Sequence, residues 1–211
     1  MKFLIYFILI FYPIFNAIGF DLETGVILFQ DGNDNGFNDA VKGVTSSVDG
    51  YNFSHCGIYY VDTNGKKSVI EAFNDGVVLT DIDVFMNRYL TNDLKPKIVV
   101  GRLVDTLHSL IPYAIKNALI HLGKSYDYEF DLENDKIYCS ELIYFAYRYN
   151  SGDYIFETNP MTFICVDNEV QSYWQEYFKL LGVPVPEGKE GINPGAISRS
   201  KHIKIVHYYY N

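Results

Sequence analysis

The sequence predicts one α+β domain in which an antiparallel sheet packs against helices. Three observations support this fold class. The chain has 211 residues, a length typical of one domain with at most a short appended segment. Its first half contains short apolar segments separated by polar turns, as expected for neighbouring antiparallel strands. Its second half carries apolar residues at helical spacing, and 48% of all residues are hydrophobic, which is enough for a buried core.

Residues 1–19 predict an export signal that is separate from the domain. Lys2 precedes an unbroken apolar run from Phe3 to Tyr12, and Ala17 and Gly19 supply small residues at the cleavage positions. This pattern is typical of a secretory signal peptide. The alternative is an uncleaved anchor helix, although the run is short for a bilayer span. We therefore expect residues 20–211 to form one domain that is secreted or periplasmic and has no stable membrane span, or membrane-associated if the segment is retained.

Six segments predict the strands of the sheet. Each is a short apolar or alternating run, and each is bounded by residues that favour turns, such as glycine, asparagine and aspartate. The segment that starts at Lys97 also follows a proline, which suits the first residue of a strand. The predicted strands are Gly25–Gln30, His55–Asp62, Lys67–Phe73, Gly76–Ile82, Lys97–Val104 and Lys204–Tyr210.

The second and third of these strands are predicted to form a hairpin. A three-residue turn at Thr63-Asn64-Gly65 places a glycine where a left-handed backbone is favoured. This turn pairs His55 with Phe73 and puts Glu71 on the same face as His55, one diagonal step away. A two-residue turn would instead send His55 and Glu71 to opposite faces. With the three-residue turn, Cys56 points to the other face, which we expect to be the core.

The helices are predicted from apolar periodicity and from residues that start or stop helices. We expect a polar surface loop at Asp31–Asn38, followed by a short helix. A second helix is expected to begin at Ser109 as N-cap and to end at Gly123. A third begins near Ile137, after an acidic loop. The predicted helices are Asp39–Ser47, Ser109–Gly123, Ile137–Tyr149 and Asn168–Leu181.

Composition excludes some classes of function. The formal net charge is −9, whereas a protein that binds nucleic acid broadly needs a basic surface to neutralise phosphates. The histidines, cysteines and acidic residues do not follow the spacing of metal ligands. We therefore expect no nucleic-acid partner, no metal and no cofactor.

Three residues form a candidate set for thiol chemistry. Cys139 falls in the first turn of a predicted helix, where the helix dipole favours a thiolate, although the acidic loop at Asp131–Asp135 opposes this. His55 starts a strand, and Glu71 is a charged residue in the middle of an apolar strand. Each residue alone has a structural interpretation, since cysteine is among the most buried residue types. Together, a cysteine, a histidine and a carboxylate are the groups that thiol nucleophilic catalysis requires.

The cysteine count is odd, because Cys56, Cys139 and Cys165 are the only three. In an exported protein this excludes a complete disulfide framework and leaves at least one free thiol. We expect no disulfide that involves Cys139.

Four motifs in this order, SHCGIYY, VIEAFNDGV, GKSYDYEF and YCSELIYFAY, resemble the YiiX/YebB group of permuted papain-like cysteine hydrolases, which are relatives of the NlpC-type peptidases. The resemblance covers nearly all of residues 22–207 and implies a circularly permuted papain-like (NlpC-type) fold, with an antiparallel sheet or partial barrel packed against helices. It also implies that Cys139 is the nucleophile, His55 the general base and Glu71 the orienting residue. Tyr126 matches the tyrosine that lines the oxyanion region together with the backbone N–H of Cys139.

The resemblance and the residues together predict an exported cysteine hydrolase that cleaves an amide bond through a Cys-His-Glu triad and a thioester intermediate. The expected substrate is a cell-wall peptide or an N-acyl amino compound, which includes small peptides and amino-acid amides. Two alternatives stay open. One is thioester-mediated acyl transfer with an acyl-lipid substrate, and the other is a binding module that keeps the fold without turnover.

Overall fold

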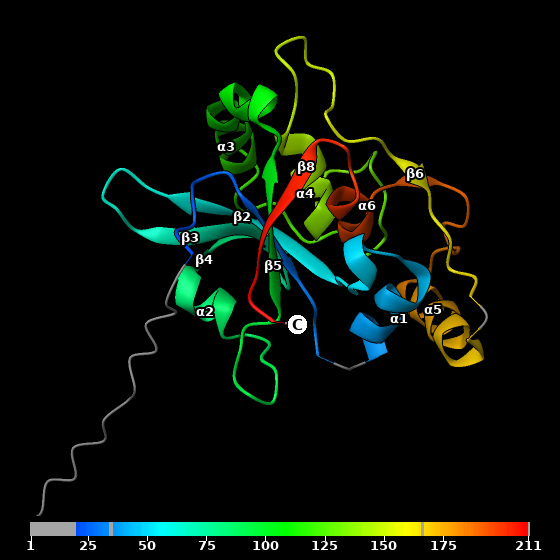
Figure 1. The fold of residues 1–211 in the computed structure, drawn as a ribbon. Helices are drawn as coiled ribbons and strands as arrows, with labels where there is room; N and C mark the ends of the chain where they lie inside the picture. The colour runs from blue at the N-terminus through cyan, green and yellow to red at the C-terminus, as the bar shows by residue number, and fades with distance from the viewer. Residues whose placement is uncertain (1–19, 34–35, 166, 211) are drawn as a thin grey trace, which may run out of the picture.

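The computed structural model of the protein describes residues 20–33, 36–165 and 167–210. The predicted export signal, residues 1–19, lies outside the described residues. The described part contains a mainly antiparallel β-structure with helices on both sides, as the sequence predicts (Figure 1).

Six strands form the main sheet, in the order β4-β3-β2-β1-β5-β8, and every neighbouring pair is antiparallel. The sheet therefore has β4 at one edge and the C-terminal strand β8 at the other (Figure 1). Two short strands, β6 and β7, pair separately. The strands are β1 Ile27–Gln30, β2 His55–Val61, β3 Lys67–Phe73, β4 Gly76–Asp81, β5 Ile98–Leu103, β6 Asn159–Pro160, β7 Glu190–Gly191 and β8 Ile203–Tyr208.

The helices divide into those that cover the sheet and those that lie beside one end of it. Figure 1 shows α1 and α5 side by side at that end, next to α6. The helices are α1 Gly36–Val44, α2 Ile82–Met86, α3 Ile111–Leu119, α4 Cys139–Ala146, α5 Asn168–Leu181 and α6 Pro194–Ser198, with 3-10 turns at Val48–Gly50 and Asp105–Leu110.

Both faces of the sheet are buried, because side chains alternate between two apolar clusters along each strand. One face carries Ile27, Phe29, Cys56 and Ile58 and packs against α3 and α4. The opposite face is covered by α2 and by the segment that begins at Phe20. A third cluster joins α1 to α5 around the tryptophan Trp174, which is 2% exposed.

The β2–β3 hairpin has the predicted register. Ile58 pairs with Ile70 and Val61 pairs with Lys67, and the three-residue turn between the strands is closed by the hydrogen bond from the Gly65 N–H to the Asp62 carbonyl. Gly65 has a φ of 82°, the left-handed conformation that this turn requires. Cys56 is fully buried on the face that packs against α4, which confirms its predicted place in the core.

Several predicted helix ends are wrong. Ser109 does not cap a helix but lies inside a 3-10 turn, and α3 begins after it, at Ile111, because Pro112 suits the first turn of a helix. The same helix ends at Leu119, before Gly123. The first helix begins at Gly36, inside the predicted Asp31–Asn38 loop.

Two further differences affect the site. The helix expected from Ile137 begins at Cys139, because Ile137 pairs with Tyr126 in an isolated parallel bridge. The strand expected to reach Ile82 ends at Asp81, whose carboxylate accepts a hydrogen bond from the Asp83 N–H. Asp81 thereby caps α2, a helix of five residues that sequence periodicity did not predict.

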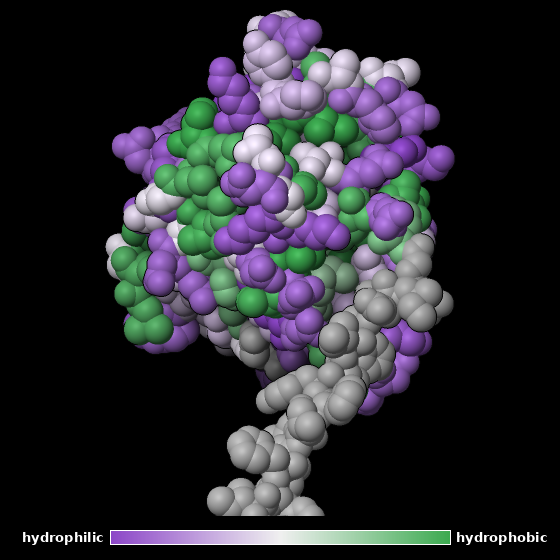
Figure 2. Space-filling model, turned by 90° about the vertical axis from the view of Figure 1, so that its left-hand side faces the viewer, coloured by the Kyte–Doolittle hydropathy of each residue, from purple (hydrophilic) through white to green (hydrophobic). Residues whose placement is uncertain are grey.

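The outer surface of the sheet edge mixes apolar and hydrophilic side chains. Figure 2 shows the side of the molecule that faces left in Figure 1, where green groups adjoin one another at places among purple ones. The edge strand β4 contributes the exposed residues Val78 and Leu79. Within the described part of the chain, no helix is both long and apolar enough to cross a membrane.

Candidate active site

The register of the β2–β3 hairpin brings His55 and Glu71 into contact. Nε2 of His55 lies 2.5 Å from Oε2 of Glu71, although sixteen positions separate the two residues in the sequence. The side chain of Glu71 is 0% exposed and that of His55 is 8% exposed. The predicted diagonal pair is therefore a buried hydrogen-bonded pair, which fixes the plane of the imidazole ring and leaves Nδ1 for another partner.

Glu71 is held by three groups, which explains how a carboxylate can be buried in this strand. The Arg88 guanidinium binds it with both terminal nitrogens, at 2.9 Å to Oε2 and 2.5 Å to Oε1, and the Thr80 hydroxyl donates to Oε1. Burial alone raises the pKa of Glu71, but the hydrogen bonds from Arg88 and His55 outweigh it and lower the pKa to about 2. Glu71 is therefore ionised at neutral pH.

Arg88 comes from the loop after α2, and its position depends on neighbours on that face of the sheet. Its guanidinium lies 3.9 Å from the centre of the Phe73 ring and also contacts the oxygen of the Gln30 side chain at 3.4 Å. Neither Arg88 nor Thr80 was predicted as a site residue. One sequence feature indicates the position of Arg88. Asp81 is a helix N-cap, so a short helix begins after it and turns the chain that carries Arg88 back toward β3.

Cys139 is the first residue of α4 and lies against the start of β2. Its thiolate form is favoured by three neighbours, the Cys56 thiol, His55 and the backbone N–H of Ser140. The hydrogen bond from Cys56 lowers the pKa of Cys139 well below its usual value; burial opposes this, and the hydrogen bond to His55 lowers the pKa further.

The partner of this thiol is a protonated imidazole. Burial alone lowers the pKa of His55, but its hydrogen bonds to Cys139 and Glu71 raise it from the usual 6.5 to about 9. The lowered pKa of Cys139 and the raised pKa of His55 both favour a thiolate–imidazolium pair. Of the acidic residues expected to oppose the thiolate, Asp131 is paired with Lys189 at 3.1 Å.

Tyr126 lies on the loop that leads into α4. The bridge to Ile137 ties this loop to the residue two positions before Cys139, and the Ile137 N–H donates to the Ser125 carbonyl at 3.0 Å. Burial raises the pKa of Tyr126 and the charge of Cys139 raises it further, so its hydroxyl stays protonated at neutral pH. Tyr126 lines the cavity that contains Cys139 and the cavity that contains His55.

Two cavities meet at Tyr126. One, of about 100 Å³, has Cys139 in its wall and is otherwise lined mainly by apolar groups of α1, α5, the segment around β6 and the loop before α4, which include Phe37, Val41, Phe130, Met161, Phe163 and Trp174. The other, of about 360 Å³, has His55 in its wall together with Asn38, Asn74 and Tyr89. Phe37, Ser54 and Tyr126 belong to both walls. The thiolate thus faces an apolar space, and the imidazolium faces a more polar one.

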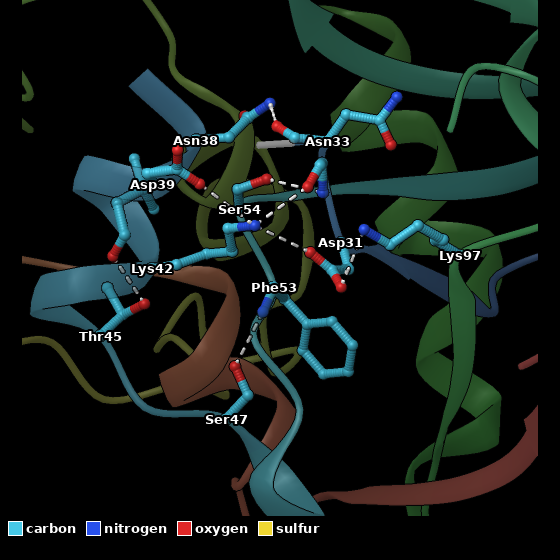
Figure 3. A network of polar contacts seen from close by, with 12 residues as sticks. Asp31, Asn33, Asn38, Asp39, Lys42, Thr45, Ser47, Phe53, Ser54 and Lys97 are labelled. Atoms are coloured by element: carbon cyan, nitrogen blue, oxygen red, sulfur yellow. Dashed lines mark hydrogen bonds and ion pairs between the residues drawn. The ribbon is translucent and has the colours of Figure 1, made fainter. Parts of the chain in front are cut away.

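A polar network positions the segment directly before His55 (Figure 3). The Ser54 hydroxyl accepts the Gly32 N–H at 3.0 Å, and the Asp31 carboxylate lies 3.3 Å from both Lys42 and Lys97. Lys42 also donates to the Gly32 carbonyl at 3.1 Å. These contacts hold the end of β1, helix α1 and the start of β5 together. They thereby fix the segment directly before His55 and the part of the cavity wall that α1 forms.

The site is made of protein groups that hold and move protons. Within residues 20–33, 36–165 and 167–210, no cluster of three histidine, cysteine or acidic side chains is arranged to hold a metal ion. The four residues singled out from the sequence, Cys139, His55, Glu71 and Tyr126, lie together at the point where β2, β3, α4 and the loop before α4 meet.

Comparisons with known proteins agree with this architecture. A family model described as "Permuted papain-like amidase enzyme, YaeF/YiiX, C92 family" matches residues 21–207. Among solved structures, the chain is similar to the "metalloprotein yiiX" from Escherichia coli O157:H7, with 22% sequence identity and a TM-score of 0.72 over 90% of this chain and 98% of that chain. No curated protein matches the chain. The expected fold class, an α+β permuted papain-like fold, is confirmed.

Proposed function

The chain belongs to the permuted papain-like amidases of the YaeF/YiiX, C92 family, and from this premise we propose that it is an exported cysteine hydrolase that cleaves an amide bond through Cys139, His55 and Glu71. The observation that carries the proposal is the buried pair in which His55 contacts Glu71 at 2.5 Å, with Cys139 at the start of α4 in the wall of an apolar cavity and with its pKa lowered by His55. A thiolate, a proton donor and an orienting carboxylate in contact are the groups that acyl transfer to sulfur needs.

The first half of the reaction uses the resting charges of the site. The Cys139 thiolate attacks the amide carbonyl carbon, and the negative charge moves to the carbonyl oxygen. The Tyr126 hydroxyl and the backbone N–H groups at the start of α4 then stabilise this oxyanion; the support is that Tyr126 and Cys139 line the same cavity. The His55 imidazolium then gives its proton to the leaving amine, the carbon–nitrogen bond breaks, and a thioester to Cys139 remains.

The second half uses the neutral imidazole that the first half leaves behind. His55 takes a proton from a water molecule, and the resulting hydroxide attacks the thioester carbonyl and releases the acid and the thiolate. Glu71 stays ionised throughout and stabilises the imidazolium without accepting its proton, because Arg88 and Thr80 hold it as a carboxylate.

The cavities favour an N-acyl amino compound as substrate. The apolar space lies on the Cys139 side, where the acyl part of the amide would sit, and the more polar space lies on the His55 side, where the amine leaves. A cell-wall peptide offers a polar group on both sides and uses the apolar space less well. The apolar space also suits the acyl chain of a lipid, so acyl transfer to an acceptor other than water is the second candidate.

Export is the part of the proposal that rests on residues 1–19. The support is the positive Lys2, the apolar run from Phe3 to Tyr12 and the small residues Ala17 and Gly19. The amide substrate would then be met outside the cytoplasm.

The test is a panel of N-acyl amino acids with acyl chains of increasing length, with small peptides and cell-wall fragments as comparison. We expect the acid and the amine as products, the highest kcat/KM for apolar acyl groups, and an acyl adduct on Cys139 that hydroxylamine removes. A lipid or amine acceptor is added in parallel, because transfer to that acceptor in preference to water identifies the acyltransferase.

Four variants rank the roles in the same assay. Cys139→Ala abolishes turnover, His55→Ala is nearly as damaging because the two act as a unit, and Glu71→Gln costs less. Tyr126→Phe lowers kcat by about 10²–10³ if its hydroxyl donates to the oxyanion. Cys165→Ala, which removes a thiol outside the site, is the matched control. Turnover that survives Cys139→Ala would overturn the mechanism.

A further inference from the structure

A larger cavity adjoins the apolar cavity that contains Cys139. Its volume is about 580 Å³, against about 100 Å³ for the apolar one. The two cavities share five wall residues, which come from the end of α1, from β6 and from the segment between β7 and α6: Val44, Thr45, Asn159, Ile192 and Asn193. A molecule bound at Cys139 therefore has the larger cavity next to it, against the wall that α6 forms.

The size of the apolar cavity limits the part of a substrate that it can hold. In other proteins an apolar cavity of roughly 150 Å³ takes up one benzene molecule. The space beside Cys139 is smaller, so it accommodates a few carbon atoms of an acyl group. A longer acyl group has to continue beyond this space. Because the two cavities share part of their walls, the larger one is where its far end would lie.

The larger cavity differs from the first in its charged side chains. Apart from Cys139, only neutral residues line the apolar cavity, whereas Arg199, Lys201 and Glu157 line the larger one, together with His202. Two permanent cations thus face one carboxylate, in a chain whose formal net charge is −9. Within the described part of the chain, none of these three charged groups forms an ion pair. The local excess of positive charge favours an anion in this cavity.

The guanidinium of Arg199 is held in position by the loop after α1. Its Nη1 donates to the Ser46 carbonyl and, at 2.7 Å, to the Ser46 hydroxyl. Its Nε and Nη2 make no hydrogen bond with any described residue, so this edge keeps two parallel donors. Such an edge matches two oxygens of a carboxylate or a phosphate. Arg199 is therefore oriented before a ligand arrives.

From these observations we propose that the larger cavity binds a negatively charged oxygen group, a carboxylate or a phosphate, at the far end of the acyl group, with Arg199 and Lys201 as its partners. The inference rests on the proposed function, whose substrates it narrows to amides of an acyl group with an anionic second end. The carbonyl carbon lies at Cys139, the next few carbons lie in the apolar cavity, and the anion lies at the two cations. Arg199 and Lys201 thus determine specificity and take no part in the bond cleavage.

The test compares anilides of dicarboxylic acids of increasing chain length with the anilides in which the free carboxylate is replaced by a carboxamide. Aniline release gives kcat/KM for each member of a pair. At the length that spans both cavities we expect kcat/KM to be about 10-fold or more higher for the carboxylate. The ratio should fall as salt is added, because salt screens the attraction. A third series that ends in a phosphate shows which of the two oxygen groups is preferred.

Charge variants of the cavity wall have opposite expected effects on this ratio. Arg199→Gln and Lys201→Gln should each lower it, and Glu157→Gln should raise it, since the carboxylate repels the anion. The Lys201 side chain makes no hydrogen bond with a described residue, so Lys201→Gln tests the cavity without disturbing the contact of Arg199 with its loop. Lys204→Gln is the matched control. It removes the same charge from an exposed residue of β8 that does not line the cavity, and it should leave the ratio unchanged.

Binding without turnover separates this inference from the proposed function. Calorimetry on Cys139→Ala should give a lower Kd for the carboxylate anilide than for its carboxamide, and adding Lys201→Gln should remove the difference. If the wild-type protein cleaves none of the anilides but this difference is found, the function fails and the anion site stands. Cleavage with equal kcat/KM for both members of every pair overturns the inference and leaves the function intact. A ratio that falls as much in Lys204→Gln as in Lys201→Gln also overturns it.

Discussion

Four side chains form two charge pairs, and His55 of one pair contacts Glu71 of the other. The pKa shifts favour a thiolate and an imidazolium for Cys139 and His55, and Glu71 and Arg88 are a carboxylate and a guanidinium. Each charge would be costly alone, and each is stabilised because an opposite charge or a hydrogen-bond donor lies next to it. Two predictions at this scale follow from the pairs.

The first concerns the pH dependence of the thiol. Because the pKa of Cys139 is lowered, first by the hydrogen bond from Cys56 and also by His55, we expect its alkylation by iodoacetamide to be nearly constant from about pH 6 to pH 8, where free cysteine gains reactivity with each unit. In His55→Ala the profile moves toward that of free cysteine. Labelling rates in the Cys165→Ser background measure this, and a wild-type profile that follows free cysteine would contradict the ion pair.

The second concerns Arg88, whose side chain is 13% exposed against a Glu71 side chain that is 0% exposed. Arg88→Met leaves the carboxylate without its main cation and should lower the free energy of unfolding by about 3–5 kcal/mol at pH 7. The double variant Glu71→Gln, Arg88→Met is the matched control and should lose less, since no buried charge is left alone. Urea unfolding gives both values, and equal losses in the two variants would count against the pair.

The sequence predicted the residues of the relay better than their surroundings. Alternation along β2 and β3 and the three-residue turn were sufficient to place His55 near Glu71, because both rules act over a few residues. Arg88 and Cys56 could not be assigned in this way. Arg88 depends on where a five-residue helix sends the chain, and the place of Cys139 in the same buried cluster as Cys56 depends on how α4 docks on the sheet, which no local pattern encodes.

At the scale of one element, α4 carries a second buried acid. Glu141 is 0% exposed, and its Oε2 accepts the Tyr138 N–H at 3.0 Å, whereas its Oε1 has no hydrogen-bond partner among the described residues. Burial raises the pKa of Glu141 from the usual 4.5 to about 9. The carboxyl is therefore neutral at pH 7, and it adds no negative charge next to the Cys139 thiolate.

This acid predicts a dependence of stability on pH. Below pH 4.5 the Glu141 carboxyl is protonated in both the folded and the unfolded state. Above pH 4.5 it ionises in the unfolded chain but not in the folded one, so the free energy of unfolding falls as the pH rises toward 9. Glu141→Gln cannot ionise and keeps the hydrogen bond to Tyr138. We expect the variant to be more stable than wild type by about 1–4 kcal/mol at pH 8, and by much less at pH 5. Parallel stability curves for the two proteins from pH 5 to pH 8 would refute this.

The next prediction concerns Gly76, the first residue of β4. Gly76 has a φ of 147°, and a Cβ there would lie 2.0 Å from the Lys124 carbonyl, on the loop that leads to Tyr126. Two hydrogen bonds join β4 to this loop, from Val77 to Lys124 at 2.8 Å and from Gly123 to Val77 at 2.9 Å. Gly76→Ala should therefore cost about 2–4 kcal/mol of stability and displace the loop.

Gly65 provides the comparison for this variant. It also has a positive φ, but no atom lies within 4 Å of its added Cβ. Gly65→Ala should therefore cost only the strain of the backbone, about 1–2 kcal/mol. Thermal unfolding of both variants decides the point, and an equal cost at the two glycines would show that the contact with Lys124 does not matter.

Helix boundaries show where sequence reasoning failed at this scale. Asn168–Leu181 is correct at both ends, because an aspartate before it caps the helix and Gly182 ends it in a left-handed conformation. Ser109 has the same capping chemistry, yet tertiary contacts place it in a 3-10 turn. The bridge between Tyr126 and Ile137 likewise delays α4, and pairing between distant segments cannot be predicted from capping residues.

For the whole molecule, the prediction concerns export. The described core begins at Phe20, whose ring stacks on His207 at 4.7 Å between ring centres. We expect the secreted protein to start near this residue, and a chain without residues 1–19 to fold and stay in the cytoplasm of the expressing cell. N-terminal sequencing of the exported protein measures this. An intact Met1 recovered from a membrane fraction would show that the segment is an anchor instead.

The position of β8 has a consequence for how the protein is made. β5 lies between β1 and β8, and its Val99 pairs with Tyr208, close to the end of the chain. A ribosome that adds roughly 5–20 residues per second makes β8 on the order of ten seconds after β5. During that interval the growing chain has every other strand of the sheet but an unpaired edge at β5, so the sheet is incomplete. A chain that threads through a translocation channel therefore completes its fold only on the far side, after its last residues have passed.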